Sequence, residues 1–152
     1  MEQQNNEQPV FNIEKIYVKD LSIEVPNAPQ IFLDAQTPEI NVELSTSTSA
    51  LDAGFFEAIL RVTVTAKLPE DRTVFLVEVA QAAIFQIRNI PDGDLEPVLA
   101  IGCPNILFPY ARETVTAAVT RAGFQPVLLQ PVNFEALYHQ RQQQLAQTAG
   151  NA

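Results

Sequence analysis

The chain has 152 residues, of which 47% are hydrophobic and 18% charged, a composition typical of a folded globular protein. It carries 18 Asp and Glu against 9 Lys and Arg, a formal net charge of -9. Such a charge repels nucleic-acid phosphates and anionic lipid and attracts basic segments. Binding to nucleic acid or to a membrane surface is therefore not expected.

The cysteine content and the polar start of the chain bear on its compartment. The single cysteine, Cys103, cannot form an intramolecular disulfide. Residues Met1–Gln8 have neither the positive nor the apolar region of a secretory signal, and no apolar run approaches the ~20 residues that span a bilayer. These features predict a cytoplasmic protein with no direct membrane insertion.

One domain is expected over residues 10–141, between two flexible tails. Residues 1–9 have almost no apolar content, and residues 142–152 are rich in Gln, Ala and Gly, so both segments are expected to be solvated.

The first strand is predicted over Phe11–Val25, where apolar and polar residues alternate. Ile16 and Val18 have the opposite parity from Leu21 and Ile23, so we expect a bulge or burial on both faces. Prolines then predict an extended or irregular segment, which carries the apolar residues Ile31, Phe32 and Leu33.

Three further strands are predicted. Alternation over residues 40–44 indicates the second strand, which the Ser/Thr run Ser45–Ser49 is expected to end. The clearest alternation runs from Phe55 to Leu68, and after a turn at Pro69–Arg72 the chain returns as a strand over Thr73–Ile90. Two long strands across a short turn predict an antiparallel hairpin.

Helices follow the strands. A short helix is expected over Leu95–Ile101, ending near Gly102, and a main helix opens at Pro104 and ends with Gly123 as its C-terminal cap. A second helix is expected from Asn133 to about Gln144. Pro109 in the main helix is expected to be tolerated because it falls near the first turn. Four strands followed by helices predict an α+β fold with an antiparallel sheet.

No group of residues indicates catalysis or metal binding. Cys103 and His139 lie in different segments with no supporting motif, and one His and one Cys are too few for a zinc site. The carboxylates of Asp92, Asp94 and Glu96 are expected to solvate a turn and to favour a helix start. The sequence therefore predicts neither an enzyme nor a cofactor.

Apolar residues in proline-bounded segments leave three interpretations open. Ile31 and Phe32 in one segment, and Phe124 with residues 127–129 in another, can belong to the core, to a subunit interface or to a groove for apolar chains. A small-residue surface on the main helix can likewise pack on its own sheet or against a second copy; its residues are Ala111, Ala117, Ala118 and Ala122.

Three strings of the sequence resemble the SecB family of export chaperones. They are IYVKDLS with EVPNAP over residues 16–29, CPNILFPYARE over residues 103–113 and PVNFEALY over residues 131–138. The strand segment LRVTVTA over residues 60–66 fits as well. The resemblance covers Val10–Tyr138 in the same order.

The resemblance implies a four-stranded antiparallel sheet with helices on one side, assembled as a homotetramer that is a dimer of dimers. It implies an ATP-independent holdase that binds unfolded precursor proteins and delivers them to the export ATPase SecA. The SecA-binding positions of the family match Asp20, Glu24, Leu76 and Glu78. The groove for client chains maps to Phe32, Ile40, Val42, Leu44, Phe134, Leu137 and Tyr138. Family members often carry Trp where this chain has Gln36.

Two alternatives stay open at this point. One is a SecB-like chaperone that serves a toxin–antitoxin system. The other is a small-ligand-binding α+β protein, which a closed cavity with convergent polar groups would favour.

Overall fold

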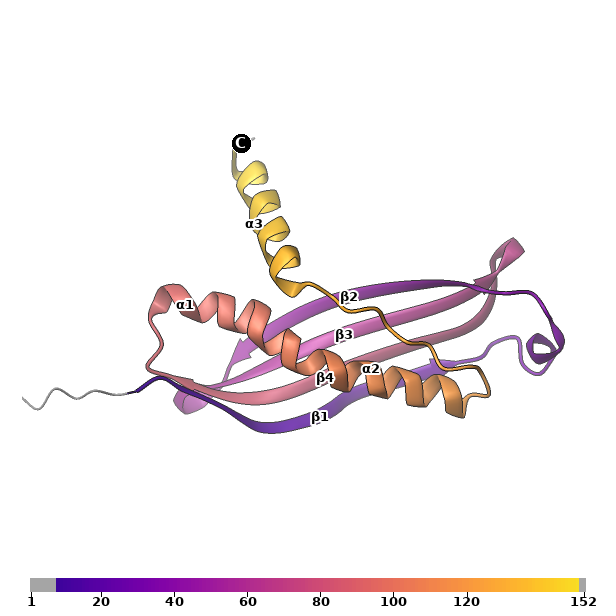
Figure 1. The fold of residues 1–152 in the computed structure, drawn as a ribbon, viewed down its shortest axis with the longest axis horizontal. Helices are drawn as coiled ribbons and strands as arrows, with labels where there is room; N and C mark the ends of the chain where they lie inside the picture. Colours follow the sequence, from indigo (N-terminus) through magenta and orange to yellow (C-terminus); the bar gives the residue numbers. More distant parts are fainter. Residues whose placement is uncertain (1–7, 151–152) are drawn as a thin grey trace, which may run out of the picture.

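The computed structural model describes residues 8–150. Its four long strands form one antiparallel sheet in the order β1-β4-β3-β2, and α2 lies across one face of it (Figure 1). The strands are β1 (Val10–Glu24), β2 (Glu39–Ala50), β3 (Phe55–Leu68) and β4 (Arg72–Arg88). The predicted α+β architecture, with helices on one side of a four-stranded antiparallel sheet, is confirmed.

The core lies between this sheet and α2 (Cys103–Arg121). Every second residue of β3 faces the helix, and Leu60, Val62, Val64 and Ala66 are each 0% exposed. Because side chains alternate along a strand, the intervening residues of β3 form the outer face of the sheet. The small residues Ala111 and Ala118 of α2 are buried within this chain, so the helix uses them to approach its own sheet.

The predicted hairpin is present, and β3 has the predicted bounds. β3 and β4 are joined by the short 3-10 turn η3 (Pro69–Asp71), in which Glu70 and Asp71 have φ angles of 66° and 60°. The parity change in β1 has the predicted cause: the pairing with β4 shifts between Ile13 and Lys15 and again between Val18 and Asp20. Both shifts are bulges, and the helix-facing residues of β1 stay apolar across them.

The prediction that residues 45–49 end the second strand is wrong. β2 continues to Ala50, and Ser45–Ala50 pair with residues Phe56–Arg61 of β3. The long partner strand supplies backbone hydrogen bonds along its whole length, which outweighs the turn preference of Ser and Thr. β1 and β2 lie at opposite edges, so the segment between them crosses the end of the sheet; it carries the 3-10 helix η1 (Gln30–Leu33).

The prediction that a short helix ends near Gly102 is also wrong. Helix α1 (Asp92–Pro97) continues through the π-helical turn η4 (Val98–Gly102) into α2, and Gly102 has right-handed helical angles of φ −64° and ψ −47°. Pro104 and Pro109 therefore lie inside a continuous helix rather than near its start. A π turn directly before Pro104 relieves the clash of its ring with the preceding turn.

Gly123 caps α2 as predicted. Its φ angle is 99°, and the amides of Gly123 and Phe124 donate to the carbonyls of Thr120 and Val119 at 3.1 and 3.2 Å. This is the Schellman arrangement of a helix end. The chain then doubles back over the sheet to α3 (Phe134–Gly150), which stands away from the sheet (Figure 1).

The start of α3 was predicted and its end was not. The Asn133 side-chain oxygen accepts a hydrogen bond from the Ala136 amide at 2.9 Å, as an N-cap does. The helix continues past the predicted end near Gln144 to Gly150, although residues 143–150 are all exposed. Of the N-terminal tail, residues 1–7 lie outside the described residues. Flexibility of both tails stays a prediction.

Candidate binding surfaces

The four residues predicted to bind SecA lie together on the sheet face that points away from α2. Ser22 of β1 stands opposite Glu78 of β4, and Glu24 stands opposite Leu76. Opposite residues in an antiparallel pair are about 5 Å apart at their Cα atoms, and Asp20 is the next outward residue along β1. We call Asp20, Glu24, Leu76 and Glu78 the docking patch; it combines three carboxylates with one apolar side chain.

Two residues outside the prediction adjoin the docking patch. Arg61 of β3 lines a hollow of about 200 Å³ together with Asp20 and Glu78. Glu43 of β2 stands opposite Thr63, which stands opposite Glu78, so a carboxylate on a third strand continues the patch. Both residues have outward parity in the sequence, and strand alternation alone could have identified them.

An apolar groove runs along the helix-facing side of β2. A hollow of about 470 Å³ lies between Ile40, Val42 and Leu44 on the strand and the returning segment Val127–Val132. Leu44 also lines a smaller hollow under α3, and a third hollow of about 510 Å³ continues from Thr46 to Leu95 and Leu145. Because neighbouring hollows share lining residues, the three form one series, which we call the β2 groove.

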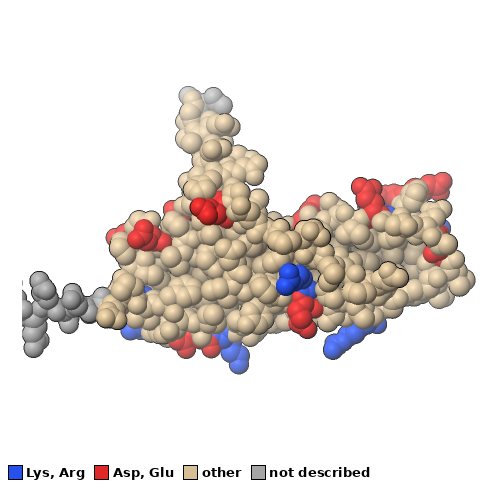
Figure 2. Space-filling model, viewed as in Figure 1, with Lys and Arg blue, Asp and Glu red and all other residues tan. Residues whose placement is uncertain are grey.

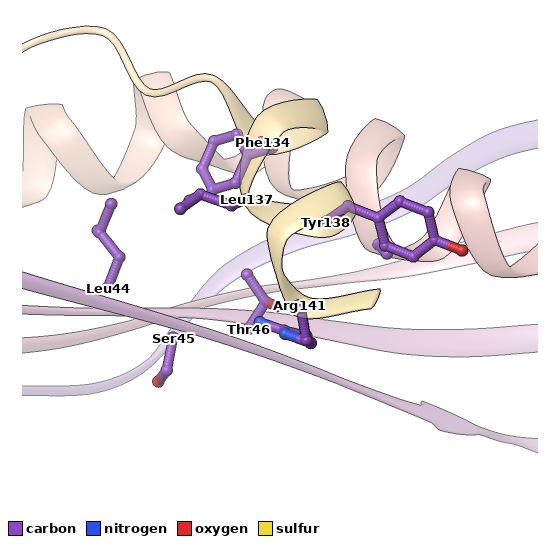
Figure 3. A pocket seen from close by; sticks show the side chains of 8 residues that line it. Leu44, Ser45, Thr46, Phe134, Leu137, Tyr138 and Arg141 are labelled. Atoms are coloured by element: carbon purple, nitrogen blue, oxygen red, sulfur yellow. The ribbon is translucent and has the colours of Figure 1, made fainter. Parts of the chain in front are cut away.

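Figure 3 shows the middle of the β2 groove, where Leu44 and Thr46 point toward α3 and Ser45 points to the other face of the sheet. Phe134, Leu137, Tyr138 and Arg141 of α3 line the opposite side. The structure thus brings together six of the seven residues predicted for the client groove: Ile40, Val42, Leu44, Phe134, Leu137 and Tyr138.

The groove residues differ in how far they face solvent. Ile40 and Val42 are each 41% exposed and Leu137 is 42% exposed, which is unusual for apolar residues that line a depression. Phe134 is only 3% exposed and packs edge-on against Phe108, with 6.0 Å between the ring centroids. Phe134 therefore forms part of the floor of the groove, and the other residues form its open walls.

Phe32, the seventh predicted residue, lies outside this groove. Its ring stacks on Phe124 at a centroid distance of 5.0 Å and covers Gly123, beyond the C-terminal end of α2. Phe124 packs in turn on Phe75 of the core at 5.2 Å. Phe32 thus ties the proline-rich segment to the end of α2, and its part in client binding stays a prediction.

The proline-rich segment is also held by an ion pair near Gln36. The Asp34 carboxylate accepts a hydrogen bond from the Gln36 amide at 2.9 Å and pairs with Arg72 of β4. The hydrogen bond from the Gln36 backbone, followed by the pairing with Arg72, lowers the pKa of Asp34. The backbone amide makes this contact, so it does not depend on the side chain at position 36.

The buried cysteine shows the features of a core residue. The Cys103 side chain is 0% exposed, and burial raises the pKa of its thiol to about 12. A thiol that stays protonated is a poor nucleophile. Within residues 8–150, no three His, Cys, Asp or Glu side chains are grouped as metal ligands, and no helix of that part of the chain is long and apolar enough to cross a membrane.

Comparisons with known proteins identify the family of this chain. The family model described as preprotein translocase subunit SecB matches residues 4–145. The chain is 73% identical to the protein-export protein SecB of Aromatoleum aromaticum over 135 residues, which cover 89% of this chain and 85% of that one. It is 65% identical to the protein-export protein SecB of Chromobacterium violaceum over 152 residues, which cover the full length of both chains.

Among solved structures, the fold is similar to that of a SecB-like chaperone from Mycobacterium tuberculosis, solved with a peptide from an antitoxin. The TM-score is 0.68 at 20% sequence identity, covering 80% of this chain and 90% of the other. At this identity the likeness shows the fold. The matched family model and the relatives of 65% and 73% identity show that this chain belongs to the SecB family of protein-export chaperones.

Proposed function

We propose that this protein holds unfolded precursor proteins in the cytoplasm without ATP and delivers them to the export ATPase SecA. The observation that carries the proposal is the β2 groove, an open depression whose walls include the half-exposed residues Ile40, Val42 and Leu137. An unfolded chain exposes apolar segments, and each ~100 Å² buried contributes about 2.5 kcal/mol before ordering costs. A precursor that must cross a membrane has to be held before it crosses, which supports a cytoplasmic site of action.

The groove favours a chain-binding role over catalysis or small-ligand binding. It is long and open, and its part along Ile40, Val42 and Leu44 is lined mainly by apolar side chains, whereas a small-ligand site is usually an enclosed pocket with convergent polar groups. Holding by apolar burial needs no reactive group. The relatives of 65% and 73% identity are export proteins, and the antitoxin-bound neighbour is only 20% identical, which favours export over service to a toxin–antitoxin pair.

We further propose a homotetramer, a dimer of dimers, in which copies meet through the helix-bearing face. The helix-facing row of the edge strand β1 is left uncovered: Phe11, Ile13, Val18 and Leu21 are 38–47% exposed. Figure 2 views this side of the molecule, and charged residues are sparse across it and gather along its margins. An apolar, weakly charged area beside an unpaired strand edge is suited to self-association. Several grooves on one assembly can then hold one long client by effective concentration.

Delivery is assigned to the docking patch on the opposite face of the sheet. Three carboxylates around Leu76 suit a basic partner that also carries an apolar side chain, and attraction of this kind raises the association rate at low salt. Asp20→Lys or Glu78→Lys should weaken SecA binding at least ~10-fold, because each places a repelling charge in the patch. Suppression of client aggregation should survive, since the β2 groove lies on the other face.

Binding of each variant to SecA at two salt concentrations, with aggregation of an unfolded precursor measured in parallel, tests this assignment. If either charge reversal left the SecA affinity and its salt dependence unchanged, the docking patch would not be the binding site.

A further inference from the structure

A bulge in β1 places a lysine beside the docking patch. The pairing of β1 with β4 shifts between Val18 and Asp20, so Lys19 has no partner in the ladder. In a regular strand Lys19 and Asp20 would point to opposite faces. Here both belong to the outer face: Asp20 stands opposite Ala80, and the Lys19 ammonium reaches Glu57 on the outer side of β3. The bulge thereby makes a cation and a docking carboxylate neighbours on one surface.

The ammonium of Lys19 is held away from that carboxylate by Glu57. Lys19 Nζ donates to both carboxylate oxygens of Glu57, at 2.8 and 3.0 Å. Glu57 stands opposite Ile84, whereas Asp20 lies in the cross-strand row of Ala80 and Arg61. Glu57 is thus two side-chain rows from Asp20, about 13 Å along the strands. The pair crosses over β4, so the charge of Lys19 is neutralised at a distance from the patch.

Glu57 is built to act as a fixed counterion. Its side chain is only 17% exposed, while that of Lys19 is 45% exposed. It also accepts a hydrogen bond from the hydroxyl of Tyr17, whose ring packs on Ile59, Ala80 and Ala82. The hydrogen bond from Lys19, and then that from Tyr17, lowers the pKa of Glu57 and keeps the carboxylate ionised. Two groups of β1, an ammonium and a hydroxyl, therefore hold this carboxylate of β3 in place.

We propose that Glu57 is a positioning residue that keeps the Lys19 cation out of the docking patch, and that this pair sets the affinity of the patch for a basic partner. The proposal rests on the proposed function of the patch. When Glu57 is absent, the ammonium of Lys19 is free to pair with Asp20, its neighbour on the same face. That pairing neutralises a docking carboxylate and places a competing cation where the partner's cation must bind. Neither Lys19 nor Glu57 needs to touch the partner.

The Glu57→Gln variant tests the proposal, because the amide keeps the size of the side chain and can still accept from Tyr17. It should bind SecA about 3- to 5-fold more weakly at low salt, and the difference should shrink at high salt. The double variant Lys19→Gln/Glu57→Gln has the net charge of the wild type and lacks the Lys19 ammonium. Its affinity should return to within about twofold of wild type, as expected for two residues that act as a coupled pair.

Two further variants serve as controls, one for the change in net charge and one for the docking patch itself. Glu113→Gln, on the exposed side of α2, makes the same charge change on the other side of the sheet and should leave SecA affinity within about 1.5-fold, since screening limits the reach of a surface charge. Asp20→Asn reports on the docking patch itself. Melting temperatures of all variants identify any loss of fold.

The outcomes distinguish the inference from the function on which it rests. Weakening by Glu57→Gln with recovery in the double variant supports the proposal. If Asp20→Asn weakens binding but Glu57→Gln does not, or if the double variant binds as weakly as Glu57→Gln, the proposal is overturned while the docking patch stands. If Asp20→Asn leaves binding unchanged, the docking function is wrong and the proposal falls with it.

Discussion

Replacement of Leu44 by aspartate tests whether this residue lines an open groove or lies in the sealed core. Leu44 lies at the meeting point of two hollows of the β2 groove and is partly buried against the core. Full burial of a leucine side chain contributes about 1.5–3 kcal/mol, so a half-buried position loses roughly 1–2 kcal/mol in the Leu44→Asp variant. The carboxylate keeps part of its hydration because the hollow is open. For a domain of this size, the melting temperature should fall by roughly 2–8 °C.

The substitution should reduce the affinity for clients much more than it reduces the free energy of unfolding. In the Leu44→Asp variant, a client segment that covers position 44 must remove water from the introduced carboxylate without offering it a hydrogen-bond partner, which costs at least ~1–3 kcal/mol. Since ~1.4 kcal/mol corresponds to a tenfold change in affinity, binding should weaken about tenfold or more. The assay is suppression of aggregation of an unfolded precursor, measured beside thermal melting.

Asn41→Asp is the matched control. Asn41 lies on the same strand, but it stands opposite Thr65 on the outer face of the sheet. It adds the same charge and should leave client holding unchanged. A Leu44→Asp variant that melts far below the expected range would show a sealed core position, where an unpaired charge costs several kcal/mol. One that melts normally and still holds clients would remove Leu44 from the groove.

The remaining predictions concern assembly and the buried thiol. Sedimentation equilibrium at micromolar concentration should give about 67 kDa, four times the 16.8 kDa chain, and Leu21→Asp on the uncovered β1 row should shift the population toward smaller species; a wild-type monomer would contradict the assembly. A thiol reagent at neutral pH should label Cys103 only after unfolding, and fast labelling of the native protein would contradict its burial. Burial raises the pKa of the Cys103 thiol to about 12. The pKa of the Tyr17 hydroxyl is also raised to about 12, first by burial, then by its hydrogen bond to Glu57 and by the negative charge of Glu57. A group whose pKa is higher in the folded than in the unfolded chain stabilises the fold at pH values below the unfolded pKa. The melting temperature should therefore fall as pH rises from about 9 toward 12, and a melting temperature that stays constant over that range would contradict this expectation.

The sequence predicted the elements whose pattern is local and regular. The alternation of Phe55–Leu68 gave a strand with the observed bounds, and the parity change in β1 corresponds to two bulges. Gly123 and Asn133 have the capping roles that their residue types favour. In each case the residue type and the local spacing determine the structure, with no need for a distant partner.

The errors arose where a distant partner outweighs local preference. The Ser/Thr run after Leu44 remains a strand because β3 runs alongside it. Gly102 stays helical within the turn η4, which contacts β2 and α3 and packs Leu99 and Ile101 against the core. The four positions of the docking patch came one by one from the family resemblance, and their role stays a prediction, whereas the pair of Lys19 and Glu57 was not predicted. Their contact depends on a bulge and on the register of three strands, which a one-dimensional pattern does not contain.

Native mass measurement with and without an unfolded precursor, in the absence of ATP, tests whether the assembled protein holds unfolded chains. We expect an assembly of about 67 kDa, four times 16.8 kDa, whose mass rises by one precursor chain when the unfolded precursor is added and does not rise with the same precursor once folded. An assembly that gains no mass with the unfolded precursor, or that binds the folded and the unfolded chain equally, would contradict a chaperone that holds unfolded proteins.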